Sequence, residues 1–129
     1  EKFAKPAKRF MDELKADGIL NPAAPFEHDV QWVFWELWHH EGRRARHGAS
    51  MMGPDYTHWH GMYEVGKHFY RKFLPDVVKA AATKSPAMKK KYQEKVDALL
   101  AQDDHTWMKG LSAEEAERLR KMYQERYNQ

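Results

Sequence analysis

Cysteine is absent from all 129 residues of the chain. This absence excludes disulfides, thiolate metal sites, cysteine nucleophiles and the attachment of haem through cysteine. Any metal ion bound here must therefore be held by histidine, aspartate, glutamate or methionine side chains, or be brought by another chain.

Long apolar runs and a strong charge of one sign are missing as well. No run approaches the roughly 20 apolar residues of a membrane-spanning helix, so we expect no membrane span. The 22 basic and 19 acidic residues leave a net charge of +3, an excess too small to predict nucleic-acid binding. Isoleucine occurs once, at Ile19, so aromatic residues and methionine must supply much of the core.

The chain also lacks a recognisable signal peptide, and it begins with Glu1 rather than methionine. We expect a processed mature chain or a piece of a longer one. Its length is that of one domain, so residues 1–129 are expected to form a single helical domain.

Apolar periodicity and capping signals predict an all-α fold with long antiparallel helices. The expected helices span residues 2–15, 26–47, 56–83, 86–102 and 112–127. Asp17 and Gly18 are expected to end the first helix. The intervening loops are predicted at residues 21–25, 48–55 and 105–110.

Four polar or proline signals refine these boundaries. Asp55 is the predicted N-cap of the third helix, and Pro75 is expected to kink or divide that helix. Ser85 is predicted to cap the fourth helix, with Pro86 at its first position. A capping box that begins at Ser112 is predicted to open the last helix.

The residues suited to chemistry gather between Val30 and Phe73. This segment holds six of the eight histidines and four of the five tryptophans. A helix that only needed a core would use aliphatic residues. Large rings beside imidazoles therefore indicate that a flat, metal-bearing or reactive group lies against the segment.

An adjacent histidine pair and an arginine cluster lie at the centre of this segment. The side chains of His39 and His40 point about 100° apart on a helix, so they suit two separate centres better than one metal ion. Arg43, Arg44 and Arg46 carry guanidinium forks that bind carboxylates in bidentate fashion. A solvated helix end, where positive charge suits the helix dipole, is the alternative for the arginines.

Two further patterns suggest chemistry. Tyr56 follows a Gly-Pro-Asp turn, which can display a phenol outward; interface packing is the alternative. Glu36 and His39 have the i, i+3 spacing that di-metal helical bundles use. A non-haem di-metal bundle would draw on Glu36, His39, His60, Glu64 and His68. A haem-free structural or assembly module, with its histidines satisfied internally, is a further alternative.

The runs at residues 38–46, 53–56, 59–61 and 68–70 together resemble the C-terminal helical region of octahaem hydroxylamine oxidoreductases. These are periplasmic multihaem c-type cytochromes that oxidise hydroxylamine, with relatives that act on hydrazine. The resemblance is strong over residues 26–80. It combines a histidine pair, an arginine cluster and a tyrosine that precedes Trp-His-Gly.

The resemblance implies roles for individual residues. Tyr56 would be bonded covalently to the catalytic haem of a neighbouring subunit. His40 and His39 would be the first candidates for distal haem-iron ligands, ahead of His60. The complete set of candidates for ligating haem iron, packing on haem edges or pairing with propionates is His40, His39, His60, Arg43, Arg44 and Trp35.

The resemblance also implies an assembly. It predicts haem c held by another polypeptide segment, a homotrimer, a soluble c-type cytochrome as electron acceptor and a periplasmic location. Residues 1–25 would form an N-terminal helix and linker, residues 26–83 haem-contacting helices and residues 84–129 C-terminal helices. The family attaches haem through Cys-x-x-Cys-His motifs, which this chain lacks, so it would act with a haem-bearing polypeptide or be a haem-free relative.

Overall fold

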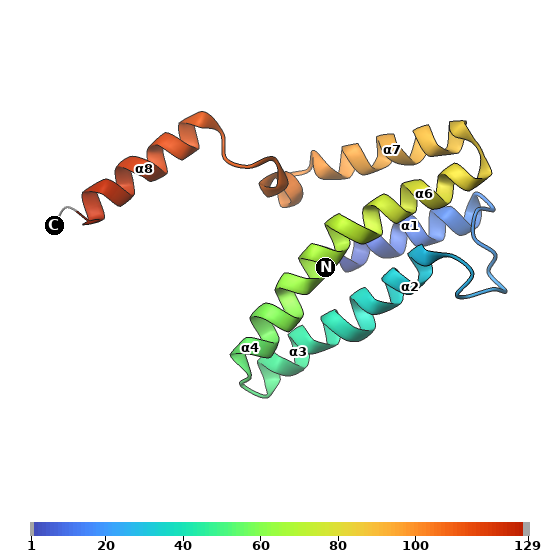
Figure 1. Ribbon diagram of the computed structural model, residues 1–129, viewed down its shortest axis with the longest axis horizontal. Helices are drawn as coiled ribbons and strands as arrows, with labels where there is room; N and C mark the ends of the chain where they lie inside the picture. The colour runs from blue at the N-terminus through green and yellow to red at the C-terminus, as the bar shows by residue number, and fades with distance from the viewer. Residues whose placement is uncertain (1, 128–129) are drawn as a thin grey trace. The chain divides into compact units, whose positions relative to one another are not determined.

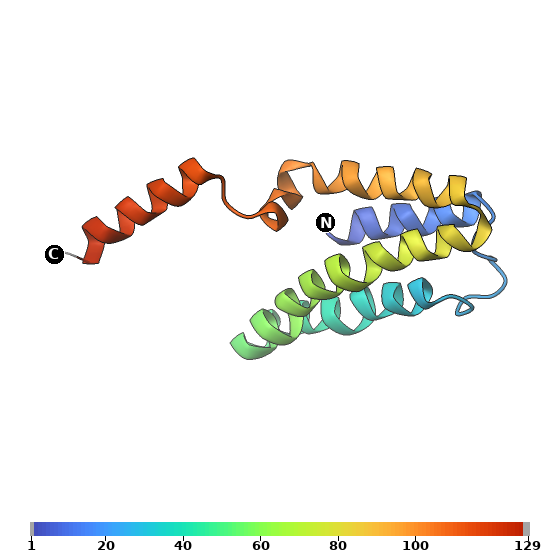
Figure 2. The same cartoon turned by 45° about the horizontal axis from the view of Figure 1, so that its top comes forward.

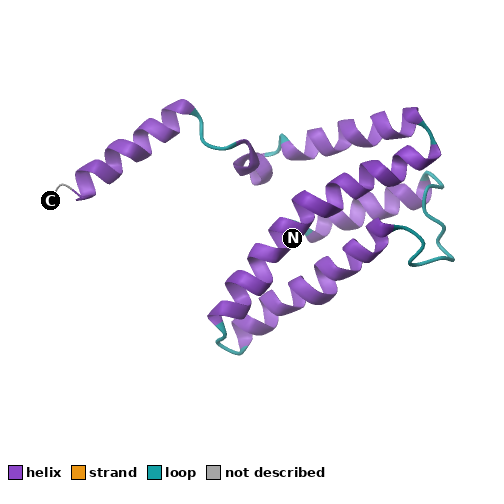
Figure 3. Cartoon of the chain, viewed as in Figure 1, coloured by secondary structure: helices purple, strands orange, loops and turns teal. Residues whose placement is uncertain are grey.

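The computed structural model describes residues 2–127, except for the side chains of residues 107–109. Every regular element in this range is a helix and none is a strand, so the predicted all-α class is confirmed (Figure 3). The chain divides into two compact units, residues 1–96 and 97–129, which are described separately. The single helical domain expected for residues 1–129 stays a prediction.

Helix α1 (Ala4–Ala16) begins the first unit. Its buried residues recur at i, i+3, i+4 and i+7, the spacing of one helix face; they are Ala7, Phe10, Met11 and Leu14. The helix ends where Gly18 adopts a left-handed backbone with φ of 64°, a conformation that costs glycine little. The predicted end at Asp17 and Gly18 is confirmed.

Residues 29–84 form two long helical runs, which we call the helical hairpin. The first run consists of α2 (Asp29–Glu36), the π-helical turn η1 (Leu37–Glu41) and α3 (Gly42–Ser50). The second consists of α4 (Pro54–Thr57), η2 (His58–Tyr63), α5 (Glu64–His68), η3 (Phe69–Phe73) and α6 (Leu74–Lys84). Helix α2 packs against α6, and α3 against α4, so the two runs are antiparallel (Figures 1 and 2).

The turn of the hairpin is shorter than the loop predicted for residues 48–55. Helix α3 continues to Ser50, and only residues 51–53 separate it from α4. The predicted N-cap role of Asp55 is wrong, because Gly53 occupies that position and Pro54 begins the helix. At the other end, the helix predicted from residue 26 starts at Asp29, with His28 as its N-cap.

Pro75 does not divide the second run. It lies in the first turn of α6, which follows directly on the π-helical turn η3 and continues to Lys84. A proline has no backbone donor and crowds the carbonyl four residues earlier in an α-helix. The wider π-helical turn changes that local geometry, which is how the run accommodates Pro75.

Helix α7 (Pro86–Leu100) completes the core of the first unit with its residues up to 96. The predicted cap is confirmed, since the Met88 N–H donates to Ser85 Oγ at 3.1 Å. Polar contacts join α7 to the end of α1. Asp17 Oδ2 accepts hydrogen bonds from Lys91 Nζ at 2.7 Å and from the hydroxyl of fully buried Tyr92 at 2.8 Å.

The second unit contains a 3₁₀-helix (Asp103–Lys109) and α8 (Ala113–Tyr127). The loop predicted for residues 105–110 is therefore largely helical. The capping box is confirmed, because the Glu115 N–H donates to Ser112 Oγ and the Ser112 N–H donates to Glu115 Oε2. None of the α8 residues is buried.

Among residues 2–127, no helix combines the length and the apolar character that crossing a bilayer requires.

Candidate functional site

Small residues bring the two runs into backbone contact near the tip of the hairpin. A Cβ atom on Gly61 would lie 2.5 Å from Ala45 Cα, and one on Gly48 would lie 2.7 Å from Thr57 Oγ1. Any larger side chain at Gly48 or Gly61 would force the runs apart. Buried Thr57 strengthens the turn by donating from Oγ1 to the Gly53 carbonyl at 3.1 Å. We call this closely packed tip, where Gly48 and Gly61 meet Thr57 and Ala45, the platform.

Tyr56 projects from this platform. It lies in the first turn of α4, and 57% of its surface is exposed. Its ring centroid is 5.5 Å from that of His60. The sequence predicted a tyrosine at a loop-to-helix junction; the structure places Tyr56 as the third residue of α4, the short four-residue helix that follows the turn. The phenol is therefore presented outward from a helix end that packs closely on α3.

A polar network lies beside Tyr56. His60 Nε2 lies 3.6 Å from Asp55 Oδ2, and His60 Nδ1 lies 3.9 Å from Glu64 Oε1. Glu64 also accepts a hydrogen bond from Arg44 Nη1 at 3.2 Å, which joins the second run to the first. Of the predicted site residues, His60 and Arg44 thus belong to one polar network with Glu64 beside Tyr56.

The hairpin exposes large apolar side chains that a helical core would normally cover. Their exposed fractions lie between 49% and 62%. We call this set the aromatic surface; it comprises Trp32, Trp38, Tyr56, Trp59, Met62 and Tyr63. Met51 and Met52 in the turn are more exposed still. Exposed apolar side chains mark interaction sites in soluble proteins where they form a contiguous patch.

A stack of rings on α2 and η1 contains three further predicted residues. The Trp35 ring lies parallel to that of His39, with centroids 4.3 Å apart, and 4.9 Å from that of His40. Partial burial lowers the pKa of His39, and the nearby positive charges of Arg43 and His40 lower it further. The lowered pKa favours the neutral form of His39, which is the form that ligates metal.

The structure assembles a different metal-ligand set from the five residues that the sequence suggested. Glu36, Glu41 and His68 each place one ligand atom within 4.8 Å of the others. His68 Nδ1 lies 2.5 Å from Glu41 Oε1. Among the described residues this is the one group of three such side chains. His39, His60 and Glu64 stay outside it.

Glu41 is the residue that sequence reasoning missed. It is only 4% exposed, and its Oε2 atom is buried without a hydrogen-bond partner among the described residues. On a regular α-helix, residues five apart point about 140° away from each other, so Glu36 and Glu41 were not expected to meet. The π-helical turn between them changes that spacing.

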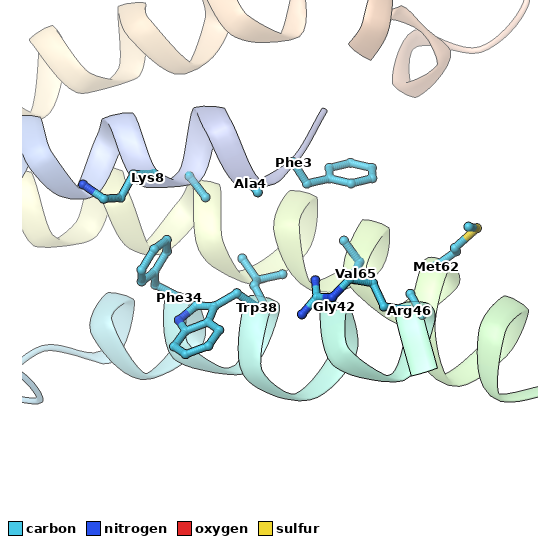
Figure 4. Close-up of a pocket in the computed structure, with 12 residues that line it drawn as sticks. Phe3, Ala4, Lys8, Phe34, Trp38, Gly42, Arg46, Met62 and Val65 are labelled. Carbon is cyan, nitrogen blue, oxygen red and sulfur yellow. The ribbon is translucent and has the colours of Figure 1, made fainter. Parts of the chain in front are cut away.

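A separate apolar pocket lies between α1 and the hairpin, with a volume of about 530 Å³. Phe3 and Ala4 line it from the α1 side, and Phe34, Trp38 and Val65 from the hairpin side (Figure 4). Lys8 and Arg46 supply its cationic groups. The pocket has the size of small-molecule or cofactor pockets.

Comparison with protein-family models, curated proteins and solved structures finds no match to this chain.

Proposed function

We propose that the helical hairpin completes the active site of a hydroxylamine oxidoreductase-type multihaem enzyme, by presenting Tyr56 to a haem held by a neighbouring subunit. The exposure of Tyr56 on the closely packed platform carries the proposal. A tyrosine that must reach another chain has to project from fixed backbone, and Tyr56 meets both requirements.

The rest of the hairpin fits the same partner. The aromatic surface leaves large rings uncovered, which suits packing against a haem edge or a neighbouring subunit. Arg43 is exposed one turn beyond His39, where a guanidinium can pair with a propionate or a subunit carboxylate. Trp35 supports the His39 ring by stacking.

Each predicted residue has a defined part in this proposal. Tyr56 forms the covalent crosslink. His40 and His39 are the first candidates for distal ligands to neighbouring haem irons, and His60 is the next. The haem itself would supply the iron at which hydroxylamine or hydrazine loses electrons.

The proposed assembly contains more than this chain. Without cysteine the chain cannot attach haem c in the manner of the family, so a haem-bearing polypeptide is required. We propose a periplasmic homotrimer that passes electrons to a soluble c-type cytochrome. The uncovered pocket and aromatic surface are consistent with a part that acquires its neighbours on assembly.

Peptide mass spectrometry of natively purified protein, together with its haem-bearing partner, tests the proposal. The peptide that contains Tyr56 should carry the mass of haem. Tyr56→Phe should leave the helical circular dichroism unchanged and abolish both the added mass and the absorption of the crosslinked haem. Tyr63→Phe is the matched control, because Tyr63 is equally exposed at 55% on the same run.

An unmodified Tyr56 peptide in protein that co-purifies with haem would contradict the proposal. So would a native haem spectrum in the Tyr56→Phe variant.

A further inference from the structure

We propose that Glu36, Glu41 and His68 form a binding site for one divalent transition-metal ion, independent of the haem interaction proposed for Tyr56. The three side chains come from both runs of the hairpin. Glu36 ends α2, Glu41 ends η1, and His68 ends α5. An ion bound here would therefore tie the two runs together at mid-height, away from the turn that carries Tyr56.

The buried carboxylate of Glu41 is the strongest observation. One of its oxygens contacts His68, and the other is buried with no hydrogen-bond partner among the described residues. A buried, unpaired carboxylate oxygen is costly, because the group has lost its hydration without a replacement. A metal ion supplies the missing partner and compensates the negative charge of Glu36 and Glu41.

The chemistry of the ligands selects the class of ion. One imidazole and two carboxylates make a mixed nitrogen and oxygen set, which suits Zn²⁺, Fe²⁺ or Mn²⁺ better than an all-oxygen cation such as Mg²⁺. Three protein ligands with a water molecule in the fourth position is a common zinc arrangement. We therefore take Zn²⁺ as the probe.

The separations are close to those of a loaded site. Zinc ligands lie about 2 Å from the ion, so their atoms are at most roughly 4 Å apart. The present limit of 4.8 Å requires only small side-chain rotations. Glu36 is half-buried and has room to make them. His68 Nδ1 and Glu41 Oε1 are 2.5 Å apart, closer than two ligand atoms of one ion, so metal binding would separate these atoms and release the proton that they share.

The backbone is shaped to make this juxtaposition. Glu36 and Glu41 are five residues apart, the spacing that a π-helical hydrogen bond connects. The Gly42 N–H donates to the Leu37 carbonyl, which closes the turn. A Cβ atom on Gly42 would lie 3.0 Å from that carbonyl oxygen, so glycine relieves crowding there. Such π-helical turns occur frequently at functional sites.

Zinc titration of the full chain, first freed of metal with a chelator, tests the site. Isothermal titration calorimetry should show saturable binding of one ion per chain. Glu41→Gln and His68→Gln should each weaken the binding by at least about tenfold, the size of effect that even outer-shell partners have. His47→Gln is the matched control, because His47 is an exposed histidine on the same hairpin and its substitution should leave the affinity unchanged.

A second measurement keeps the test valid if Glu41→Gln does not fold. Zn²⁺ should raise the thermal midpoint of the unmodified chain, since a ligand that binds only the folded state stabilises it. Half-buried Glu36→Gln should fold and lose this increase. The proposal would be overturned if the unmodified chain showed no saturable binding, or if binding survived Glu36→Gln and His68→Gln. Glu41 and His68 would then be only a hydrogen-bonded pair.

Neither result bears on Tyr56. Zinc binding by a chain whose Tyr56 peptide is unmodified would support the metal site and contradict the haem proposal. A Tyr56 peptide that carries haem, in a chain that binds no zinc, would contradict the metal site and support the haem proposal.

Discussion

At the scale of single residues, two glycines determine how closely the hairpin can pack. Gly48 and Gly61 face Thr57 and Ala45 at distances that no Cβ atom tolerates. Gly66 lies on the same run, in α5, and has nothing within 4 Å of a Cβ position. The contrast separates a glycine required by packing from one that is not.

We expect Gly61→Ala to lower the free energy of unfolding by about 1–3 kcal/mol, because the added methyl group overpacks the contact with α3. Gly66→Ala is the control, and it should be neutral or stabilise by up to about 1 kcal/mol because alanine restricts the unfolded chain. Urea unfolding followed by circular dichroism measures both. Equal midpoints for the two variants would show that the close approach does not constrain the fold.

A second residue-scale contact makes stability depend on pH. Hydrogen bonds from Lys91 and then Tyr92 lower the pKa of Asp17 below its ordinary value of 3.8. Burial, followed by the bond to Asp17, raises the pKa of Tyr92. Because the folded-state pKa of Asp17 is depressed, its stabilisation is fully present above about pH 4 and is lost as the pH falls through the folded-state value.

Asp17→Asn should therefore destabilise the chain at neutral pH and flatten the acid limb of its stability profile below pH 4. Denaturant unfolding between pH 2 and pH 7 measures this profile. Asp12→Asn serves as the control, since Asp12 pairs with Lys8 on an exposed face of α1 and such pairs contribute little. An acid limb that keeps its slope in Asp17→Asn would contradict the assignment.

At the scale of elements, the hairpin is distinguished by its π-helical turns. Three of them interrupt the two runs, at η1, η2 and η3. The first aligns Glu36 with Glu41, and the last precedes Pro75. Outside the hairpin, helices α1, α7 and α8 are α-helical throughout. The π-helical turns among residues 2–127 therefore coincide with the segment that holds most of the histidines and tryptophans.

Helix α8 depends on its cap instead of on packing. Hydrogen bonds from the Ser112 backbone and side chain lower the pKa of Glu115, so the capping box is intact above the ordinary glutamate pKa and weakens as the pH falls through the depressed value. We expect Ser112→Ala to destabilise α8 by about 1 kcal/mol. Amide hydrogen exchange at residues 113–117 measures the fraying, with Ser50→Ala as a control. Unchanged protection in Ser112→Ala would show that something other than the cap orders the helix.

At the scale of the whole molecule, two surfaces lack cover. The aromatic surface lies on the first unit, and α8 in the second unit buries none of its residues. Both features are consistent with the assembly proposed above.

Deleting residues 111–129 should leave the thermal midpoint of the remaining chain within about 2 °C of the full chain, because no buried α8 side chain is lost and a loss of 1 kcal/mol would shift it by several degrees. Differential scanning calorimetry at low protein concentration measures the midpoint. Analytical ultracentrifugation of the same pair shows whether α8 contributes to the proposed homotrimer. A large drop in the thermal midpoint without any change in oligomeric state would show that α8 stabilises the fold within one chain.

Several elements could be predicted from local sequence signals. Gly18 ended α1, Ser85 capped α7, and the Ser112 box opened α8, because each signal acts through hydrogen bonds or backbone preferences within a few residues. The turn at Gly48 and the continuity at Pro75 could not be predicted in the same way. Gly48 stays helical because it packs against Thr57, and that contact depends on the other run.

Some features of the candidate site could likewise be predicted from the sequence, and others could not. Its location between Val30 and Phe73, and the outward display of Tyr56, follow from composition and from the Gly-Pro turn. The cluster of Glu36, Glu41 and His68 depends on a π-helical turn and on a contact between residues 27 apart, neither of which has a local signature. The sequence by itself determined the helical class, the caps at Ser85 and Ser112 and the segment that holds most of the histidines and tryptophans, because these depend on composition or on near neighbours. Only the tertiary structure decided which side chains meet, because packing of the two runs sets both the register between them and the burial of Glu41.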